Sequence, residues 1–210
     1  MRVEKAFVGA RGVDSYPYSI GGTQDQAHRL KDRGVDFFVG YLGVLNGARL
    51  GYVLDAGLAF MPVTLAGEVF DGALDELAQL KALAIPIGCT VWLDLEGAKT
   101  ASHPIVDLTR LVNEWAAKIS GAGYIAGLYI APPQPFTGPE LAKLSVTRYW
   151  NSAGRVQDRT GKIWDEPEGI GFCMRQGYPQ GNFRDTGVFV DPDMIWADRR
   201  GRVPTWVVVD

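Results

Sequence analysis

The sequence predicts an α/β fold: an irregular β/α barrel of the TIM type with eight strands and about five helices. In the first two-thirds of the chain, short apolar runs alternate with segments of helical periodicity. This pattern is typical of right-handed strand–helix–strand crossovers and a parallel sheet. Three strand-like runs then follow without helical segments, so we expect the helices between strands six, seven and eight to be missing. The chain has 210 residues, near the lower end for such a barrel, which agrees with the loss of these helices.

A doubly wound open sheet is the alternative fold. Its glycine fingerprint, G-x-G-x-x-G, would follow the first strand, where this chain has GVDSYPYSIGG. The barrel is therefore preferred, as one domain over residues 1–198 with a tail over residues 199–210. The tail ends in the apolar segment VPTWVVVD, which we expect to cover the bottom of the barrel; an edge strand or a partner contact is the alternative.

The expected strands are short apolar runs bounded by turn-forming or charged residues. They cover residues 10–14, 35–43, 58–67, 90–97, 124–131, 146–153, 171–179 and 188–198. The expected helices cover residues 23–34, 49–56, 71–84, 103–123 and 137–144. Two of them open with a capping box, Thr23 with Gln26 and Thr137 with Glu140. The helix at 103–123 has apolar residues at three-to-four spacing, which is typical of a helix packed on a sheet.

The composition narrows the classes of function. Hydrophobic residues make up 47% of the chain and charged residues 21%, so the chain can bury a core. The net charge is −3 without a long basic run, so we expect no nucleic-acid partner. No apolar run approaches the ~20 residues of a membrane span, and MRVEKAFVGARG lacks the apolar core of a secretory leader. We expect Cys89 and Cys173 to be buried small hydrophobes, and nothing argues for a disulfide.

The fourth strand, TVWLDLEG, carries the main functional signal because it ends in two acids. Side chains alternate along a strand, so Trp92, Asp94 and Glu96 share one face while the other face is wholly aliphatic. The outward face of a barrel strand packs under helices and must be apolar. We therefore expect both acids to point inward at the C-terminal mouth, where such barrels place their chemistry.

An acid pair at this spacing suits cleavage of a glycosidic bond. Its Cα atoms would lie ~6.5–7 Å apart, which is compatible with the ~5–9.5 Å between the carboxyl groups of glycosidases. Crowding raises the pKa of one acid and leaves its neighbour ionised. We expect Glu96, with the longer side chain, to be the general acid and Asp94 to stabilise positive charge. The structural alternative is an ion-pair cluster with Arg148 or Arg175.

Other strand ends carry acidic, aromatic and amide side chains. Asp14 closes the first strand, and Asp191 and Asp193 lie in the eighth, its neighbour in a closed barrel, so we expect them to line the same mouth. The candidate substrate-binding residues on strands two, five, six and seven are Tyr41, Tyr129, Trp150 and Gln176. Aromatic faces stack on sugar rings while carboxylates and amides bind hydroxyl groups. This set predicts a glycan ligand.

Neither a metal site nor a cofactor is expected. His28 and His103 have no second His or Cys at ligand spacing. The chain has no GKS/T phosphate loop and no G-x-S-x-G elbow. A carboxylate-only Ca²⁺ or Mg²⁺ site at the mouth remains an open alternative.

Four motifs in order along the chain, GVDSY, VWLDLEG, YWNSAG and FVDPDMIW, resemble the glycoside hydrolase family 25 lysozymes. They are still more similar to the related glycoside-hydrolase-like domain DUF1906, the Rv2525c-like group. The resemblance spans roughly Arg11 to Asp198. It depends on the ordered set of Asp14, Asp94-x-Glu96 and Asp191.

The resemblance implies muramidase-like cleavage of peptidoglycan between N-acetylmuramic acid and N-acetylglucosamine. It implies that Glu96 is the proton donor and that Asp94 orients the substrate's acetamido group or steadies the charge. Asp14 and Asp191 would bind substrate and tune the pair. We expect a monomer acting at the cell wall, in the periplasm, outside the cell or in phage lysis. The alternative is an inactive glycan-binding barrel or a scaffold module of a phage or secretion apparatus.

Overall fold

The computed structural model describes residues 1–15, 23–96, 105–131, 135–152, 156–157, 160, 162–164, 166–177 and 190–209. Eight strands form a closed barrel: β2 (Arg11–Ser15), β3 (Phe37–Tyr41), β4 (Ala59–Leu65), β5 (Thr90–Asp94), β6 (Ile125–Ile130), β7 (Arg148–Asn151), β10 (Met174–Gln176) and β11 (Asp191–Ile195). They pair in this order around the ring, with β11 returning to β2. The predicted irregular β/α barrel is confirmed.

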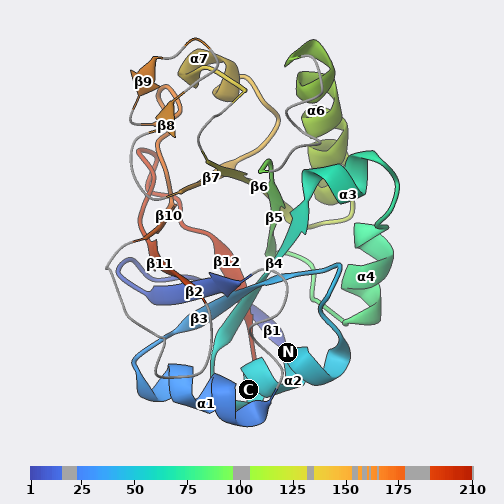
Figure 1. Cartoon of the computed structure of the whole chain (residues 1–210), viewed down its shortest axis with the longest axis vertical. Helices are drawn as coiled ribbons and strands as arrows, with labels where there is room; N and C mark the ends of the chain where they lie inside the picture. The colour runs from blue at the N-terminus through green and yellow to red at the C-terminus, as the bar shows by residue number, and fades with distance from the viewer. Residues whose placement is uncertain are drawn as a thin grey trace.

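The helices lie outside this ring. They are α1 (Gln24–Asp32), α2 (Gly47–Asp55), α3 (Ala66–Phe70), α4 (Glu76–Ala82), α6 (Ile105–Gly121) and α7 (Gly138–Leu141). Figure 1 shows α1 and α2 along one side, α3, α4 and α6 along the next, and α7 beyond them. All five predicted helices form. Thr137 and Glu140 form the expected capping box of α7, whereas at α1 the structure shows the half in which the Gln26 N–H donates to the Thr23 hydroxyl. The short helix α3, directly after β4, was not expected.

The last quarter of the barrel is built differently. Between β7 and β10 the described residues contain no helix and instead form a small hairpin of β8 (Val156–Gln157) and β9 (Ile163–Trp164). The missing helix is thus confirmed for that part of the connection which the structure describes. The segment between β10 and β11, residues 178–189, lies outside the described residues.

Strand β11 departs from the parallel sheet that repeated strand–helix units predict. It runs antiparallel to both of its neighbours, β10 and β2, whereas β2, β3, β4, β5, β6, β7 and β10 pair in parallel. Antiparallel neighbours need no helical crossover. The first residue of β11, Asp191, therefore pairs with Asp14 near the end of β2. The reversal brings the start of β11, and not its end, to the mouth.

The apolar side chains of the barrel strands fall into two layers, one outside the ring of strands and one inside it. The outer layer, between strands and helices, includes Val91, Leu93 and Leu95 of the β5 region, together with α6 residues. The inner layer fills the barrel and includes Trp92. The expected orientation of β5 is therefore confirmed. Inside, Gly127 of β6 makes room for Trp92, since a Cβ there would lie 2.5 Å from the indole ring.

The tail closes the N-terminal end of the barrel. Its strand β12 (Thr205–Val208) pairs with β1 (Arg2–Lys5) and touches β4. The Thr205 N–H donates to the Thr90 hydroxyl at 2.9 Å, and its own hydroxyl donates to the Gly88 carbonyl at 2.6 Å. Trp206 is buried in the inner layer. The segment thus both adds a strand beside β4 and covers the end of the barrel opposite to the mouth.

Two smaller expectations concern thiols and membranes. Cys89 and Cys173 are both buried and free, as the sequence indicates. Of the helices that the structure describes, none has the length and apolar character needed to cross a bilayer.

Candidate active site

Four acids meet at the mouth of the barrel, where β2 and β5 end and β11 begins. Asp14 lies on β2, Asp94 is the last residue of β5, Glu96 follows two residues later and Asp191 opens β11. The charges of Asp191 and Asp94 both act on Asp14, and that of Asp191 acts on Glu96. The structure therefore brings together four of the five acids that the sequence singled out for the mouth, all except Asp193.

Asp94 is a buried carboxylate held by two donors. Only 1% of its surface is exposed. Its Oδ2 accepts a hydrogen bond from the Tyr41 hydroxyl at 2.7 Å, and its Oδ1 accepts one from the Glu96 backbone N–H at 2.7 Å. Burial raises the pKa of Asp94 to about 6, with these two bonds opposing the rise. Since both oxygens act as acceptors, the site is built for the ionised form.

Glu96 has a different environment. Strand β5 ends at Asp94, so Glu96 lies just beyond it, and its side chain is exposed. Partial burial raises the pKa of Glu96, and the negative charge of Asp191 raises it further. The charge of Glu96 in turn raises the pKa of Asp94, as the spacing along the strand indicates, and Asp191 from β11 adds a repulsion on Glu96 that this spacing does not reveal. An accessible carboxyl with a raised pKa is what a general acid requires.

A hydrogen-bonded chain connects β6, β10 and β2 across the mouth. The Tyr129 hydroxyl donates to Gln176 Oε1 at 2.7 Å, and Gln176 Nε2 donates to Asp14 Oδ2 at 2.8 Å. The amide of Gln176 therefore has a fixed orientation, with its nitrogen toward the carboxylate. Asp14 is only 4% exposed, and burial raises its pKa to about 7.

Asp193 is the site residue whose position sequence reasoning misjudged. It was expected at the mouth, but it is fully buried in the barrel, opposite Gly12 and two residues deeper than Asp191. Its Oδ1 accepts a hydrogen bond from the Trp150 indole N–H at 2.9 Å. Because β11 runs antiparallel, later residues of this strand lie farther from the mouth. The strand direction could not be read from the sequence.

The aromatic candidates lie beneath the mouth. Tyr41, Tyr129 and Trp150 are 7%, 3% and 1% exposed. The ring of Trp150 lies 4.3 Å from that of Tyr129 and 5.7 Å from that of Trp92, measured between centroids. All three are buried in the inner layer, so they do not offer the open stacking surface that we expected. They contribute instead through polar groups: Tyr41 and Trp150 donate to Asp94 and Asp193, and Tyr129 donates to Gln176.

The two arginines proposed as structural partners of the acids are engaged elsewhere. Arg148 donates to the backbone carbonyls of Val203 and Thr147 at 2.9 and 3.0 Å. The Arg175 guanidinium lies over the Trp196 ring, 5.3 Å from its centroid. Among the residues that the structure describes, no lysine or arginine forms an ion pair with Asp94 or Glu96. The ion-pair cluster is therefore not what holds these acids.

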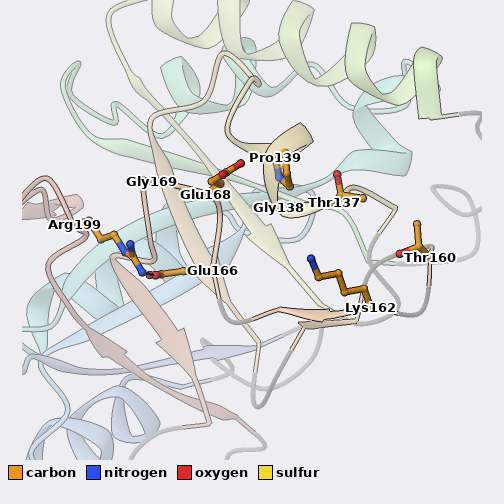
Figure 2. Close-up of a pocket in the computed structure, with 9 residues that line it drawn as sticks. All are labelled: Thr137, Gly138, Pro139, Thr160, Lys162, Glu166, Glu168, Gly169 and Arg199. Atoms are coloured by element: carbon orange, nitrogen blue, oxygen red, sulfur yellow. Dashed lines mark hydrogen bonds and ion pairs between the residues drawn. The ribbon is translucent and has the colours of Figure 1, made fainter.

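A separate cavity of about 480 Å³ lies outside the barrel, between α7 and the residues around β9. Figure 2 shows Lys162 extending toward Gly138 and Pro139, with the ion pair of Glu166 and Arg199 on the opposite side. None of the four mouth acids lines this cavity. It occupies the flank where a barrel helix is missing and is distinct from the acid cluster.

Within the described ranges, no group of three or more His, Cys, Asp or Glu has a geometry suited to a metal ion. Comparisons of the chain with family models, curated proteins and solved structures found no match.

Proposed function

We propose that the protein is a glycoside hydrolase that acts on bacterial cell-wall peptidoglycan in the manner of a muramidase. The observation that carries the proposal is the pairing of two unlike carboxyls at the mouth of a β/α barrel. Glu96 is exposed, and its pKa is raised. Asp94 is buried, which raises its pKa to about 6, and two donors to its oxygens favour the ionised form. Cleavage of a glycosidic bond requires two carboxyl groups with different roles: one donates a proton, and the other is ionised and stabilises positive charge.

In the proposed mechanism, Glu96 donates its proton to the glycosidic oxygen as the bond to the anomeric carbon breaks. The carboxylate of Asp94 stabilises the positive charge that develops on the sugar, or orients the substrate's acetamido group toward the anomeric carbon. Water then adds to that carbon, and the Glu96 carboxylate takes up the proton that the water loses. Both acids end the cycle in their starting states.

The remaining residues of the mouth serve this pair. Asp191 is exposed at the rim, and its charge helps to keep Glu96 protonated. In this proposal Asp14 and Gln176, which are hydrogen-bonded to each other and fixed by Tyr129, bind the hydroxyl groups of the sugar. Tyr41 holds Asp94. Trp150 acts from below, through Asp193.

The choice of peptidoglycan among glycans comes from the resemblance of the four motifs to family 25 lysozymes and to the DUF1906 domain. It places the proposed action at the cell wall, in the periplasm, outside the cell or in phage lysis. We propose that the protein acts as a monomer.

The test is the release of soluble muropeptides from purified peptidoglycan, comparing wild type with Glu96→Gln. Glu114→Gln is the matched control. Glu114 is exposed on α6, where it forms an ion pair with Arg110, and it is not one of the mouth acids. The proposal predicts release by wild type and the control, and its loss in Glu96→Gln. Equal release by wild type and Glu96→Gln, or none by either, contradicts it. Sedimentation with cell walls without release would identify a glycan-binding barrel instead.

A further inference from the structure

Asp193 lies inside the barrel, one level below the mouth, where no substrate reaches it. Along the antiparallel pair of β11 with β2, Asp191 is opposite Asp14 and Asp193 is opposite Gly12. Asp193 is thus the diagonal neighbour of Asp14 on the inner face of the sheet. The two carboxyl groups are close enough for the charge of Asp14 to act on Asp193.

The donors around Asp193 leave one of its oxygens unmatched. Its Oδ1 accepts from the Trp150 indole N–H, which can only donate. Its Oδ2 is buried, and none of the described residues donates to it. An ionised carboxylate can only accept. A proton on Oδ2 would instead make this oxygen a donor, and the carboxylate of Asp14, the diagonal neighbour of Asp193, offers an acceptor.

The charges around Asp193 also favour a proton on its carboxyl group. Among the described residues, the groups that act on Asp193 are Trp150 from β7, Asp14 from β2 and Asp191 from its own strand, and none of these is positive. Two ionised carboxylates in contact in a dry interior repel each other strongly. Burial first, and then the charge of Asp14, raise the pKa of Asp193 well above its usual value.

We propose that Asp193 is a neutral carboxylic acid whose Oδ2–H donates to Asp14, and that it is the positioning residue of Asp14. The pair then carries one negative charge, on Asp14. That carboxylate is fixed by two donors, Asp193 from below and Gln176 from the side. Trp150 fixes which oxygen of Asp193 carries the proton, because its N–H occupies Oδ1.

The catalytic meaning of this arrangement rests on the proposed hydrolase function. Asp14 and Asp94 interact through their charges. A second charge, on Asp193, would favour proton uptake by Asp94, and protonated Asp94 can no longer stabilise a positively charged sugar. A neutral Asp193 holds Asp14 in place without adding that charge.

The variant Asp193→Asn tests the proton directly. Its amide oxygen can accept from Trp150 and its NH₂ group can donate to Asp14, so it reproduces a neutral acid. By capillary electrophoresis at neutral pH, Asp193→Asn should migrate with wild type. The control Asp55→Asn, at the exposed end of α2, should migrate as a protein that has lost one negative charge. If Asp193→Asn shifts by the same step as the control, Asp193 is ionised and the proposal is wrong.

Infrared spectroscopy provides a measurement on wild type, independent of how well the variant folds. In wild type at about pH 8, where most exposed carboxyls are ionised, the carbonyl stretch of a protonated carboxyl should be present. It should be lost in folded Asp193→Asn. Its absence from wild type, or an identical spectrum in the variant, overturns the proposal.

Activity then separates the two proposals. Asp193→Asn should keep kcat/KM within about threefold and leave its pH profile unshifted. Asp193→Ala, which removes a hydrogen bond to a charged group, should lose on the order of tenfold to a hundredfold. Equal losses in both variants contradict the positioning role. If wild type releases no muropeptides, the hydrolase proposal fails, while electrophoresis and infrared spectroscopy still decide the state of Asp193.

Discussion

Removing the hydroxyl group of Tyr41 should change the proton affinity of Asp94 more than any other property of the site. This hydroxyl donates to Asp94 Oδ2 at 2.7 Å in a buried setting, and the bond lowers the pKa of Asp94 against the larger effect of burial. Tyr41→Phe keeps the ring and its packing but leaves that oxygen without a donor. Asp94 should therefore bind its proton more tightly.

The size of the shift follows from the strength of the bond. A hydrogen bond to a charged group contributes about 1.5–3 kcal/mol, and 1.36 kcal/mol corresponds to one pKa unit. The pKa of Asp94, about 6 in wild type, should rise to about 7–8 in Tyr41→Phe. The acid limb of the plot of kcat/KM against pH should shift to higher pH by about 1–2 units as well, because Asp94 must be ionised to act.

Stability gives the same information without an activity assay. The lost bond matters most when Asp94 is ionised, which in the folded wild type occurs above about pH 6. The free energy of unfolding lost in Tyr41→Phe, from denaturant titrations, should therefore be smallest at acid pH and grow as the pH rises through about 6. Tyr124→Phe is the control: it loses a bond to the Ile85 carbonyl and should show no such pH dependence. A pH-independent cost in Tyr41→Phe would refute the reasoning.

Two further predictions concern the rim and the interior. Asp191→Asn removes the charge that helps to raise the pKa of Glu96, so the alkaline limb of the plot of kcat/KM against pH should move to lower pH. An alkaline limb that stays in place or moves to higher pH would show that Asp191 does not raise the pKa of Glu96. Gly127→Ala places a Cβ 2.5 Å from the Trp92 ring and should lower the free energy of unfolding by about 1–3 kcal/mol; a thermal or denaturant midpoint equal to that of wild type would show that the barrel interior has spare room.

The orientation of β5 could be predicted because its two faces differ so clearly. Alternation assigns the aliphatic residues to one face and Trp92 and Asp94 to the other, and only the aliphatic face can pack under helices. The helices could be predicted for a similar reason, since their apolar spacing and caps are local. Features that depend on a single element and its period were therefore readable.

Features that depend on how distant segments meet were not readable. The direction of β11 is set by its pairing with β10 and β2, and this direction decides that Asp191 is at the rim and Asp193 is buried. The depth of Tyr41, Tyr129 and Trp150 follows from their packing against each other and Trp92. No local pattern in the sequence distinguishes a tyrosine that stacks on a ligand from one that supports an acid.

Glu96 illustrates the boundary between the two kinds of feature. Its place near the mouth follows from the strand that precedes it. However, β5 ends at Asp94, and the chain then turns so that the Glu96 backbone N–H donates a hydrogen bond to the Asp94 carboxylate. The turn separates the environments of the two acids: one stays under the rim and the other is exposed. Spacing along the strand predicts that the acids are neighbours, and only the turn gives them different roles.

The most direct test of the central claim is the identity of the reducing ends that appear when purified peptidoglycan is digested. The account predicts that wild type produces new reducing ends at N-acetylmuramic acid, detected by mass spectrometry after borohydride reduction, and that Glu96→Gln produces none. New reducing ends at the same rate in Glu96→Gln, or at N-acetylglucosamine in wild type, would contradict it.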